Sequence, residues 1–432
     1  MSTILSAASL VLFYLSIDNK KKLIIPLVAL AFSNAYINYS TSGLENALLN
    51  FLFSSLFFVY VKKQNLKHFS LYVYLLISLI ALTRIDALLV VLPILINIFF
   101  IVDKSKFWRK SLILLLGFSP LILWELFSLF YYGFPFPNTF YAKLTAGFPI
   151  IEYLQRGVSY FFDTLSRDPI TFIGLLAGCA AVFFLPKRVK PLSLGIFLYI
   201  FFVFYIGGDF MPGRMYASIF FLSMLLITQV QRETNVKLIV ATSGILIFIG
   251  FLADCPTPLM FSAKLASNTN SQIIDQRRLM MGGTSLFRNG HLNSSIEMDG
   301  KIWGFGGYNW IADEREAGTL YEMPVFIWKA IGLFGYFGGQ EIRIIDQFAL
   351  SDPLLARLPA FSNPNWRVGH LERYLPEGYP QSIADPKVKL ADKQIEEYNN
   401  HLKVLTQSKL FSKGRLLEIL RFNIGYYDYL LK

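Results

Sequence analysis

The sequence predicts a polytopic α-helical membrane protein of about ten spans, with a mixed α/β domain outside the membrane at its C-terminal end. Of its 432 residues, 54% are apolar and only 16% are charged, whereas soluble domains average about 25% charged residues. Hydropathy changes once, near residue 253, and no stretch of membrane length follows that point. The expected domains are therefore 1–253, a multi-span transmembrane domain, and 254–432, an extracytoplasmic soluble domain.

Each apolar stretch of the first domain is separated from the next by a short polar loop, and each is expected to form a membrane-spanning helix. Several are shorter than the roughly 20 residues that a perpendicular helix needs, so the ends are approximate. The expected spans are 3–17, 23–37, 44–61, 69–83, 87–102, 111–131, 169–186, 191–207, 215–230 and 238–253.

Alternate loops differ in charge, and this difference predicts the orientation. One set holds fifteen basic residues, beginning with Lys20, Lys21 and Lys22, and the other set holds five. Because basic loops stay on the cytoplasmic side, the second set and residues 254–432 should face outward. The start of the first span would then lie outside as well. Either an upstream helix is missing, so that the chain is N-terminally truncated, or one span is miscounted.

Charged and polar residues gather in the loops expected on the outer face. Charges at the ends of membrane helices are costly and therefore suggest function. The carboxylates are candidates for removing a proton from an acceptor hydroxyl, and cationic and polar groups are candidates for binding a phosphate. The catalytic candidates are Glu45, Asp86 and Asp209, and the binding candidates in these loops are Arg84, Asn138, Tyr141, Lys143 and Arg214.

Structural roles are open for several of these residues. Tyr141, with the neighbouring Phe134, Phe136 and Phe140, fits an interfacial aromatic belt. Arg84 and Asp86 fit an interfacial ion pair, Glu45 fits a helix N-cap, and Asp209 with Arg214 fits a braced turn. Convergence of several loops on one membrane face favours the functional interpretation. A transporter would instead place such groups near the membrane midplane, where its helices are broken.

The outer domain should contain a buried helix at 327–335, a strand at 341–346, a short helix at 352–360 and a helical tail at 390–432. Asp352 is the expected cap of the helix at 352–360, with Pro353 at its first position. Four residues add to the candidates for phosphate or sugar binding: Arg357, Arg367, His370 and Arg373.

Several classes of protein are disfavoured by the sequence. The four histidines are scattered without ligand spacing, so no metal site is expected. The chain has no Walker motif and no Rossmann glycine pattern, so no nucleotide cofactor is expected. The formal charge of +11 is concentrated in short loops, as membrane topology requires, and therefore does not indicate nucleic-acid binding.

Four segments, in order, carry a resemblance to a known family: 137–143 (PNTFYAK), 207–214 (GGDFMPGR), 346 with 351–359 (SDPLLARLP), and 366–379 (WRVGH…R…PEGY). They resemble terminal β-(1→2)-arabinofuranosyltransferases of mycobacteria and their bacterial relatives, some of which are labelled flagellar motor control protein. The resemblance covers roughly residues 40–385. The family is similar to the GT-C glycosyltransferases, which are multi-span membrane enzymes.

The resemblance implies an enzyme of the cytoplasmic (inner) membrane that acts on its outer face. It would transfer a sugar, such as arabinofuranose, from a polyprenyl-phosphate donor to a cell-envelope glycan, a glycolipid or another glycoconjugate, without a cofactor. Such enzymes usually carry a catalytic aspartate in the first outer loop, and this chain lacks that loop, as expected of a truncated chain. The alternatives are a non-catalytic membrane assembly factor and a transporter of a lipid-linked sugar.

Overall fold

The computed structural model describes residues 1–103, 105–231, 235–252, 272–275, 297–298, 301–302, 325–329, 331–340, 342–363 and 366–431. The chain forms two compact units. The first comprises Met1–Trp124 with Ile150–Ser262, and the second comprises Glu125–Pro149 with Ala263–Lys432. The division after residue 262 lies close to the boundary expected at 253. Residues 125–149, which the sequence assigned to 1–253, instead belong to the second unit.

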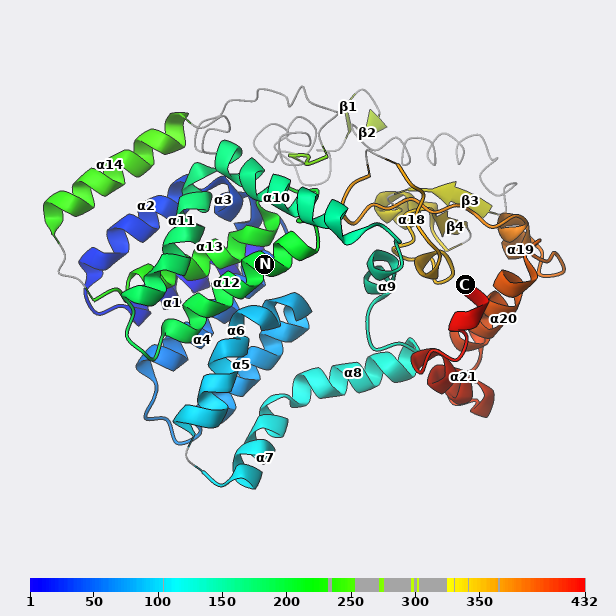
Figure 1. The fold of residues 1–432 in the computed structure, drawn as a ribbon, viewed down its shortest axis with the longest axis horizontal. Coiled ribbons are helices and arrows are strands. Elements are labelled where there is room, and N and C mark those ends of the chain that lie inside the picture. Colours follow the sequence, from blue (N-terminus) through cyan, green and yellow to red (C-terminus); the bar gives the residue numbers. More distant parts are fainter. Residues whose placement is uncertain are drawn as a thin grey trace. The chain divides into compact units, whose positions relative to one another are not determined.

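The first unit is a helical bundle (Figure 1), and every apolar stretch expected within it corresponds to at least one helix. α10 (Ile150–Arg167) was not expected as a span, because its polar residues make it amphipathic. The main bundle helices are α1 (Ser2–Ser16), α4 (Asn46–Lys62), α5 (Phe69–Thr83), α6 (Leu88–Asn97), α11 (Pro169–Ala180), α12 (Lys190–Tyr205), α13 (Arg214–Ile227) and α14 (Val236–Leu252).

Three pairs of consecutive helices are interrupted by bends. The expected span 23–37 is divided into α2 (Ile24–Phe32) and α3 (Asn34–Ser40), which meet at 75°. The expected span 111–131 is divided into α7 (Phe107–Gly117) and α8 (Ser119–Tyr131). α10 and α11 meet at 116°. Each of these interruptions shortens the continuous apolar helix.

A buried carboxylate stabilises two of these bends. Asp168 caps α11 by accepting a hydrogen bond from the Thr171 amide at 3.2 Å. Its other oxygen accepts from the Ala35 amide at 2.8 Å and the Thr171 hydroxyl at 2.6 Å. Ser33 caps α3 through the Tyr36 amide at 3.0 Å. Asp168 therefore joins the break between α2 and α3 to the break between α10 and α11.

The ten expected membrane crossings are not confirmed by helix length. Among the described residues one helical stretch, Ile85–Val102, is long and apolar enough to cross a membrane, and the number rises to four if each bent pair is one crossing. Six further apolar helices have 10–17 residues. α4, for example, has 17 residues and is about 26 Å long, against a hydrocarbon core of about 30 Å.

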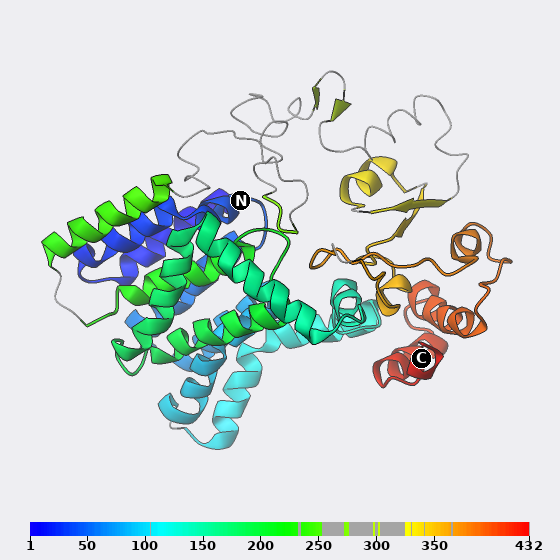
Figure 2. The same cartoon turned by 45° about the horizontal axis from the view of Figure 1, so that its top comes forward.

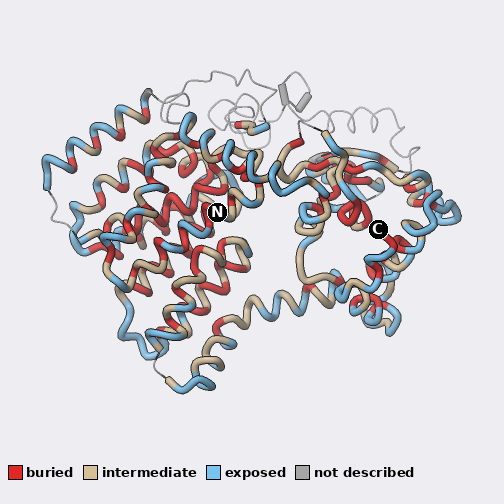
Figure 3. The backbone as a smooth tube through the Cα atoms, viewed as in Figure 1, coloured by how far each residue is buried: buried red, intermediate tan, exposed pale blue. Residues whose placement is uncertain are grey.

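α13 is the central helix of the first unit. Every residue from Met215 to Leu226 is buried, and the facing sides of its neighbours are buried as well (Figure 3). Two aromatic contacts pack against it: Phe221 meets Phe13 edge to face at 5.9 Å and stacks on Tyr36 at 5.7 Å. The first residue of this fixed helix is Arg214, which belongs to the candidate site described below.

The second unit combines helices with two short sheets. β3 (Val325–Trp328) pairs in parallel with β4 (Arg343–Asp346), and β1 (Glu297–Met298) pairs with β2 (Lys301–Ile302). β4 confirms the strand expected at 341–346. The helix expected at 327–335 is wrong in part: the β-branched and aromatic run Val-Phe-Ile-Trp favours a strand, and the helix α18 (Gly332–Gly338) begins only after it.

The remaining helices of the second unit pack around one apolar core, which includes Leu354, Leu355, Tyr379 and Leu402. The helix expected at 352–360 is a single 3₁₀ turn, η5 (Leu355–Arg357), and the expected helical tail is present. The other helices are α9 (Asn138–Leu144), α19 (Tyr379–Ala384), α20 (Lys393–Gln407), α21 (Lys413–Asn423) and η6 (Asp428–Leu431).

Candidate functional site

The first unit holds a connected group of five charged residues, called here the ion-pair network: Glu45, Arg84, Asp86, Asp209 and Arg214. All five lie at helix ends. Glu45 immediately precedes α4, Arg84 follows α5, and Asp86 lies in the 3₁₀ turn η2 (Ile85–Ala87) ahead of α6. Asp209 follows α12, and Arg214 begins α13. The structure thus brings together five of the residues that the sequence selected.

Arg84 and Asp86 form a two-point ion pair. Arg84 Nε donates to Asp86 Oδ1 at 3.0 Å, and Arg84 Nη2 donates to Asp86 Oδ2 at 2.6 Å. Tyr199 of α12 donates its hydroxyl to Asp86 Oδ2 at 3.0 Å. Both carboxylate oxygens are therefore engaged, and paired hydrogen bonds of this geometry fix orientation as well as charge. Asp86 is positioned as a partner of Arg84 more than as a proton acceptor.

Glu45 lies between the two arginines. Its Oε1 accepts from Arg84 Nη1 at 2.7 Å and from Arg214 Nη2 at 3.0 Å. The Glu45 side chain is 21% exposed, against 14% for Arg84. Glu45 therefore joins the ends of α4, α5 and α13, and it keeps part of its surface open to solvent.

Arg214 also contacts Asp209, which lies in the loop between α12 and α13. Nη1 of Arg214 donates to Asp209 Oδ2 at 3.3 Å. Nε of Arg214 is buried and has no hydrogen-bond partner among the described residues. An unused guanidinium N–H at this position is a donor that a ligand oxygen would satisfy.

The loop before Arg214 is fixed by tyrosines and by glycines in left-handed conformations. Tyr39 donates to the Pro212 carbonyl at 3.0 Å, and Tyr160 donates to the Met211 carbonyl at 3.0 Å. Gly208 has φ +77°, and a Cβ there would lie 2.5 Å from the Tyr160 ring. Only glycine fits this approach, so the loop presents Asp209 and Arg214 in one defined geometry.

The charge of the network limits what it can bind. Three carboxylates and two guanidinium groups leave one net negative charge. A phosphate would therefore be attracted only through Arg214, whose Nε is unused, and not by the network as a whole. Carboxylates on partly exposed side chains, such as Glu45, suit sugar or acceptor hydroxyls better.

The opposite end of the same bundle is basic. α4 ends at Lys62, and two residues earlier Tyr60 donates to the Arg188 carbonyl at 3.0 Å. Lys22 Nζ donates to the Val230 carbonyl, beyond the end of α13, at 2.7 Å. These bonds hold the basic loops together at the C-terminal ends of α4 and α13. The ion-pair network lies at the N-terminal ends of the same two helices. The two sets of loops that differ in basic charge in the sequence therefore lie at opposite ends of the folded first unit.

In the second unit, Asn138 and Arg357 bind the main chain. Asn138 Nδ2 donates to the carbonyls of Ala349 at 3.1 Å and Asp352 at 3.0 Å. Arg357 Nη1 donates to Asn138 Oδ1 at 3.1 Å and to the Pro353 carbonyl at 2.6 Å. These bonds join α9 to η5 and favour a structural role for both residues.

The Arg357 guanidinium is also enclosed by aromatic rings. It lies 4.1 Å from the Phe134 ring centroid and 4.8 Å from that of Tyr141. Arg357 is 8% exposed, and burial lowers its pKa. Cation–π contacts of this kind stabilise a desolvated cation. Tyr141, a predicted binding residue, thus packs against Arg357.

Asp352 and Arg373 are both buried in the second unit. Asp352 Oδ1 accepts from the Leu355 amide at 2.8 Å, which makes it the cap of η5 as the sequence predicted. Tyr379 donates to Asp352 Oδ2 at 3.0 Å. Arg373 is 1% exposed and donates to the carbonyls of Leu371, at 2.8 Å, and Ala142. Arg373 therefore also holds the main chain of α9.

Lys143, Arg367 and His370 form a more accessible group, called here the cationic turn. Arg367 and His370 are the ends of a tight turn, closed by the His370 amide donating to the Arg367 carbonyl at 3.0 Å. Gly369 within it has φ +81°, and a Cβ there would lie 3.6 Å from Lys143 Cε. The Lys143 side chain is exposed. Arg367 and His370 are half-buried. Of the candidates in the second unit, Lys143 is therefore best placed to meet an anion from solvent.

Two residues with important contacts were missed by the sequence analysis. Tyr199 lies in the middle of an apolar stretch, and its only signal was a polar hydroxyl in a predicted span. Asp168 precedes Pro169, and this Asp-Pro pair is a helix-start signal that would have located the bend. Within the part of the chain that the structure describes, no group of histidine, cysteine, aspartate and glutamate could hold a metal ion.

Comparisons with protein-family models, with curated proteins and with solved structures found no match to this chain.

Proposed function

We propose that this chain is a membrane glycosyltransferase of the GT-C kind. It moves a sugar from a polyprenyl-phosphate donor to a cell-envelope glycan or glycoconjugate on the outer face of the bacterial cytoplasmic membrane. The observation that supports the proposal is the ion-pair network, which lies at the end of an apolar bundle opposite to its basic loops. Enzymes that act on lipid-linked substrates need polar and charged residues at the level of the lipid headgroups.

The bundle surface supports membrane placement. Large apolar side chains are exposed along several helices, among them Ile4 at 73%, Leu123 at 65% and Phe248 at 64%. Exposed large apolar side chains on several helices of one bundle are typical of a lipid-facing surface. The bends at Ser33 and Asp168 are internally hydrogen-bonded, as backbone within a bilayer requires.

Within the proposal each network residue has a role. Both arginines meet two carboxylates, but Nε, Nη1 and Nη2 of Arg84 all donate to them, whereas Arg214 keeps an unused Nε that it offers to the donor phosphate. Glu45 or Asp209 accepts the proton of the acceptor hydroxyl as its oxygen attacks the anomeric carbon, and the polyprenyl phosphate leaves. Asp86 holds Arg84 in place. The cationic turn is a separate anion-binding surface of the second unit.

A second function, a non-catalytic assembly factor, is favoured by the internal pairing of Arg84. Its Nε, Nη1 and Nη2 all donate to Asp86 or Glu45, so the network also works as a brace between helix ends. The transporter alternative is less well supported, because none of the five charged residues lies at the break of a bent helix pair, where a transporter would place its binding site.

Sugar transfer by the purified chain in lipid nanodiscs tests the proposal. A panel of radiolabelled polyprenyl-phosphate sugars is supplied with envelope glycan, and transfer and donor hydrolysis are measured. Arg214→Lys keeps the charge but loses the planar fork, and should lower turnover about 100-fold. Lys63→Ala, at the basic end, is the matched control and should be neutral. Absence of both turnover and polyprenyl-phosphate binding, in a folded chain, would leave the assembly factor as the better proposal.

A further inference from the structure

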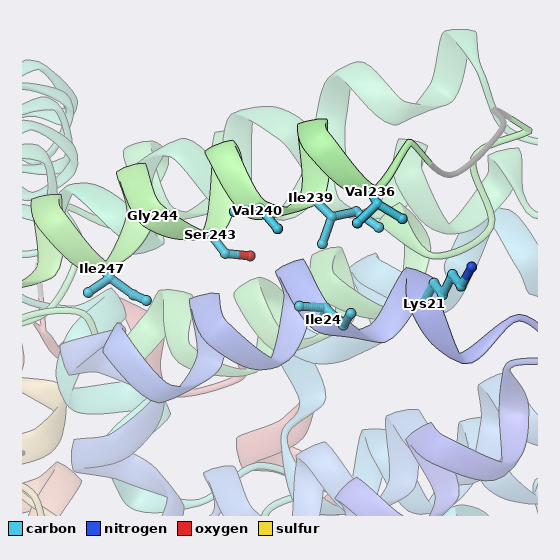
Figure 4. A pocket seen from close by; sticks show the side chains of 8 residues that line it. All are labelled: Lys21, Ile24, Val236, Ile239, Val240, Ser243, Gly244 and Ile247. Carbon is cyan, nitrogen blue, oxygen red and sulfur yellow. The ribbon is translucent and has the colours of Figure 1, made fainter.

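A groove of about 480 Å³ lies between α2 and α14, away from the ion-pair network (Figure 4). The two helices run side by side in both views of the fold (Figures 1 and 2). Ile24 lies on the α2 side of the groove, and Val236, Ile239, Val240, Gly244 and Ile247 lie on the α14 side. The α14 residues extend over twelve positions, from 236 to 247, or about 16 Å of helix.

One end of this groove is closed by side chains. Phe32, the last residue of α2, meets Phe251 edge to face at 5.5 Å. A Cβ on Gly250 would lie 2.6 Å from the Phe32 ring, so α2 and α14 touch there. The groove therefore ends just beyond Ile247, in the direction of Phe32.

The other end meets the lysine run of η1 (Lys20–Leu23). The Lys20 ammonium donates to the Tyr14 and Ile17 carbonyls at 2.5 and 2.7 Å, and the Lys22 ammonium donates to the Val230 carbonyl at 2.7 Å. Lys21, which lines the groove, has no such bond among the described residues. Among the described residues, the Lys21 ammonium is therefore left without a hydrogen-bond acceptor at the open end of the apolar groove.

Two residues of α14 describe the lining of the groove. A Cβ on Gly244 would meet no atom within 4 Å, although glycine weakens a helix interior. The Ser243 hydroxyl is buried without a partner among the described residues and points into the groove (Figure 4). A buried hydroxyl of this kind is satisfied when a ligand supplies an acceptor, such as a lipid ester carbonyl.

We propose that this groove binds an anionic phospholipid of the cytoplasmic leaflet, with one acyl chain along α14 and the headgroup phosphate on Lys21. The apolar lining, the closed far end and the free ammonium at the open end match the chain and the phosphate of one lipid. Basic residues at a membrane surface attract anionic lipids. The proposal depends on membrane placement of the bundle, but not on sugar transfer.

A phospholipid fits this position better than the polyprenyl-phosphate donor does. Lys21 lies in the run whose neighbour Lys22 binds Val230, beyond the C-terminal end of α13. The ion-pair network lies at Arg214, the N-terminal end of the same helix. The 14 residues of α13 separate the two by about 21 Å, so a phosphate at Lys21 is far from the proposed catalytic groups.

Titration of the purified full chain in neutral detergent tests the proposal, with occupancy read by native mass spectrometry. The probes are phosphatidylglycerol and phosphatidylcholine with identical acyl chains. We expect one site that prefers phosphatidylglycerol by about tenfold. Lys21→Glu should weaken its binding about tenfold, because the change removes an attraction and adds a repulsion. A Cβ at Gly244 meets no atom within 4 Å, so Gly244→Leu adds bulk to the groove and should weaken binding of both lipids about tenfold.

Matched variants separate the groove from general effects. Lys63→Glu changes the same charge near the basic end of α4, and Ile245→Leu alters the neighbouring, 58% exposed position of α14; both should bind as the unchanged chain does. Equal binding of the two lipids, or unchanged binding in Lys21→Glu and Gly244→Leu, would overturn the proposal. Displacement of phosphatidylglycerol by an equal concentration of undecaprenyl phosphate would also overturn the proposal, because it would indicate that the groove binds the polyprenyl-phosphate donor.

Discussion

Glu45 accepts hydrogen bonds from Arg214, a residue 169 positions later in the chain, at 3.0 and 3.3 Å. The same carboxylate meets Arg84 at 2.7 Å. One partly exposed side chain therefore connects the first residue of the central helix α13 to the ends of α4 and α5. A substitution at Glu45 therefore distinguishes the two functions proposed for the network, because each function predicts a different result.

Glu45→Gln should destabilise the first unit by about 1–3 kcal/mol, because two guanidinium groups lose their shared anion. Thermal unfolding in detergent, followed by intrinsic fluorescence, measures the change. Glu397→Gln, at an exposed glutamate of α20, is the control and should be neutral. If the network only braces the bundle, the variant should also support normal envelope glycans at a permissive temperature. If Glu45 accepts a proton in sugar transfer, glycan synthesis should fail at all temperatures.

Asn138→Ala should destabilise the second unit by about 1–3 kcal/mol, because the carbonyls of Ala349 and Asp352 and the Arg357 guanidinium lose a partner. Faster hydrogen exchange in residues 349–357 would report the loss. Asn400→Ala, at an exposed position of α20, serves for comparison. Unchanged exchange in Asn138→Ala would show that α9 does not hold η5 in place.

Asp352 should give the second unit a specific pH dependence. Burial raises the pKa of Asp352 above its ordinary value of 3.8, although bonds from the Leu355 amide and Tyr379 act in the opposite direction. The folded chain therefore holds this proton more tightly than the unfolded chain, and stability falls as pH rises through the folded pKa. Asp352→Asn should remove that fall in the interval above 3.8.

Unfolding midpoints measured from about pH 3.5 to about pH 7 test this prediction. Asparagine keeps an oxygen that can cap η5, so the variant should remain folded. Asp385→Asn, at an exposed aspartate, should leave the pH profile unchanged. An identical profile for Asp352→Asn and the unchanged chain would contradict the assignment.

Lys143→Gln should weaken binding of a lipid phosphate to the cationic turn about fivefold, because one charge near the anion is lost. Polyprenyl phosphate in nanodiscs is the probe, and binding should also weaken as salt is raised. Lys389→Gln, at another exposed lysine of the second unit, is the control. Equal effects of the two variants would mean that the turn contributes only general positive charge.

The helices were largely predictable, because hydropathy alone marks an apolar helix. The bends were not, since the cap made by Asp168 depends on Ala35, far away in the chain. Convergence of Glu45, Arg84 and Arg214 was expected from loop charge. The structural roles of Asn138, Arg357 and Arg373 were not predictable, because a polar side chain that binds main-chain carbonyls and one that binds phosphate look alike in a sequence.

Residues 125–149 lie inside the sequence of the first unit but fold with the second. The polypeptide therefore passes between the units three times, and no single cut frees the C-terminal part intact. A chain ending after α14 would leave Asn138 and the carbonyl of Ala142 without their partners Arg357 and Arg373. An isolated C-terminal fragment would lack α9. For expression as a separate protein, the second unit needs 125–149 fused to it by a linker.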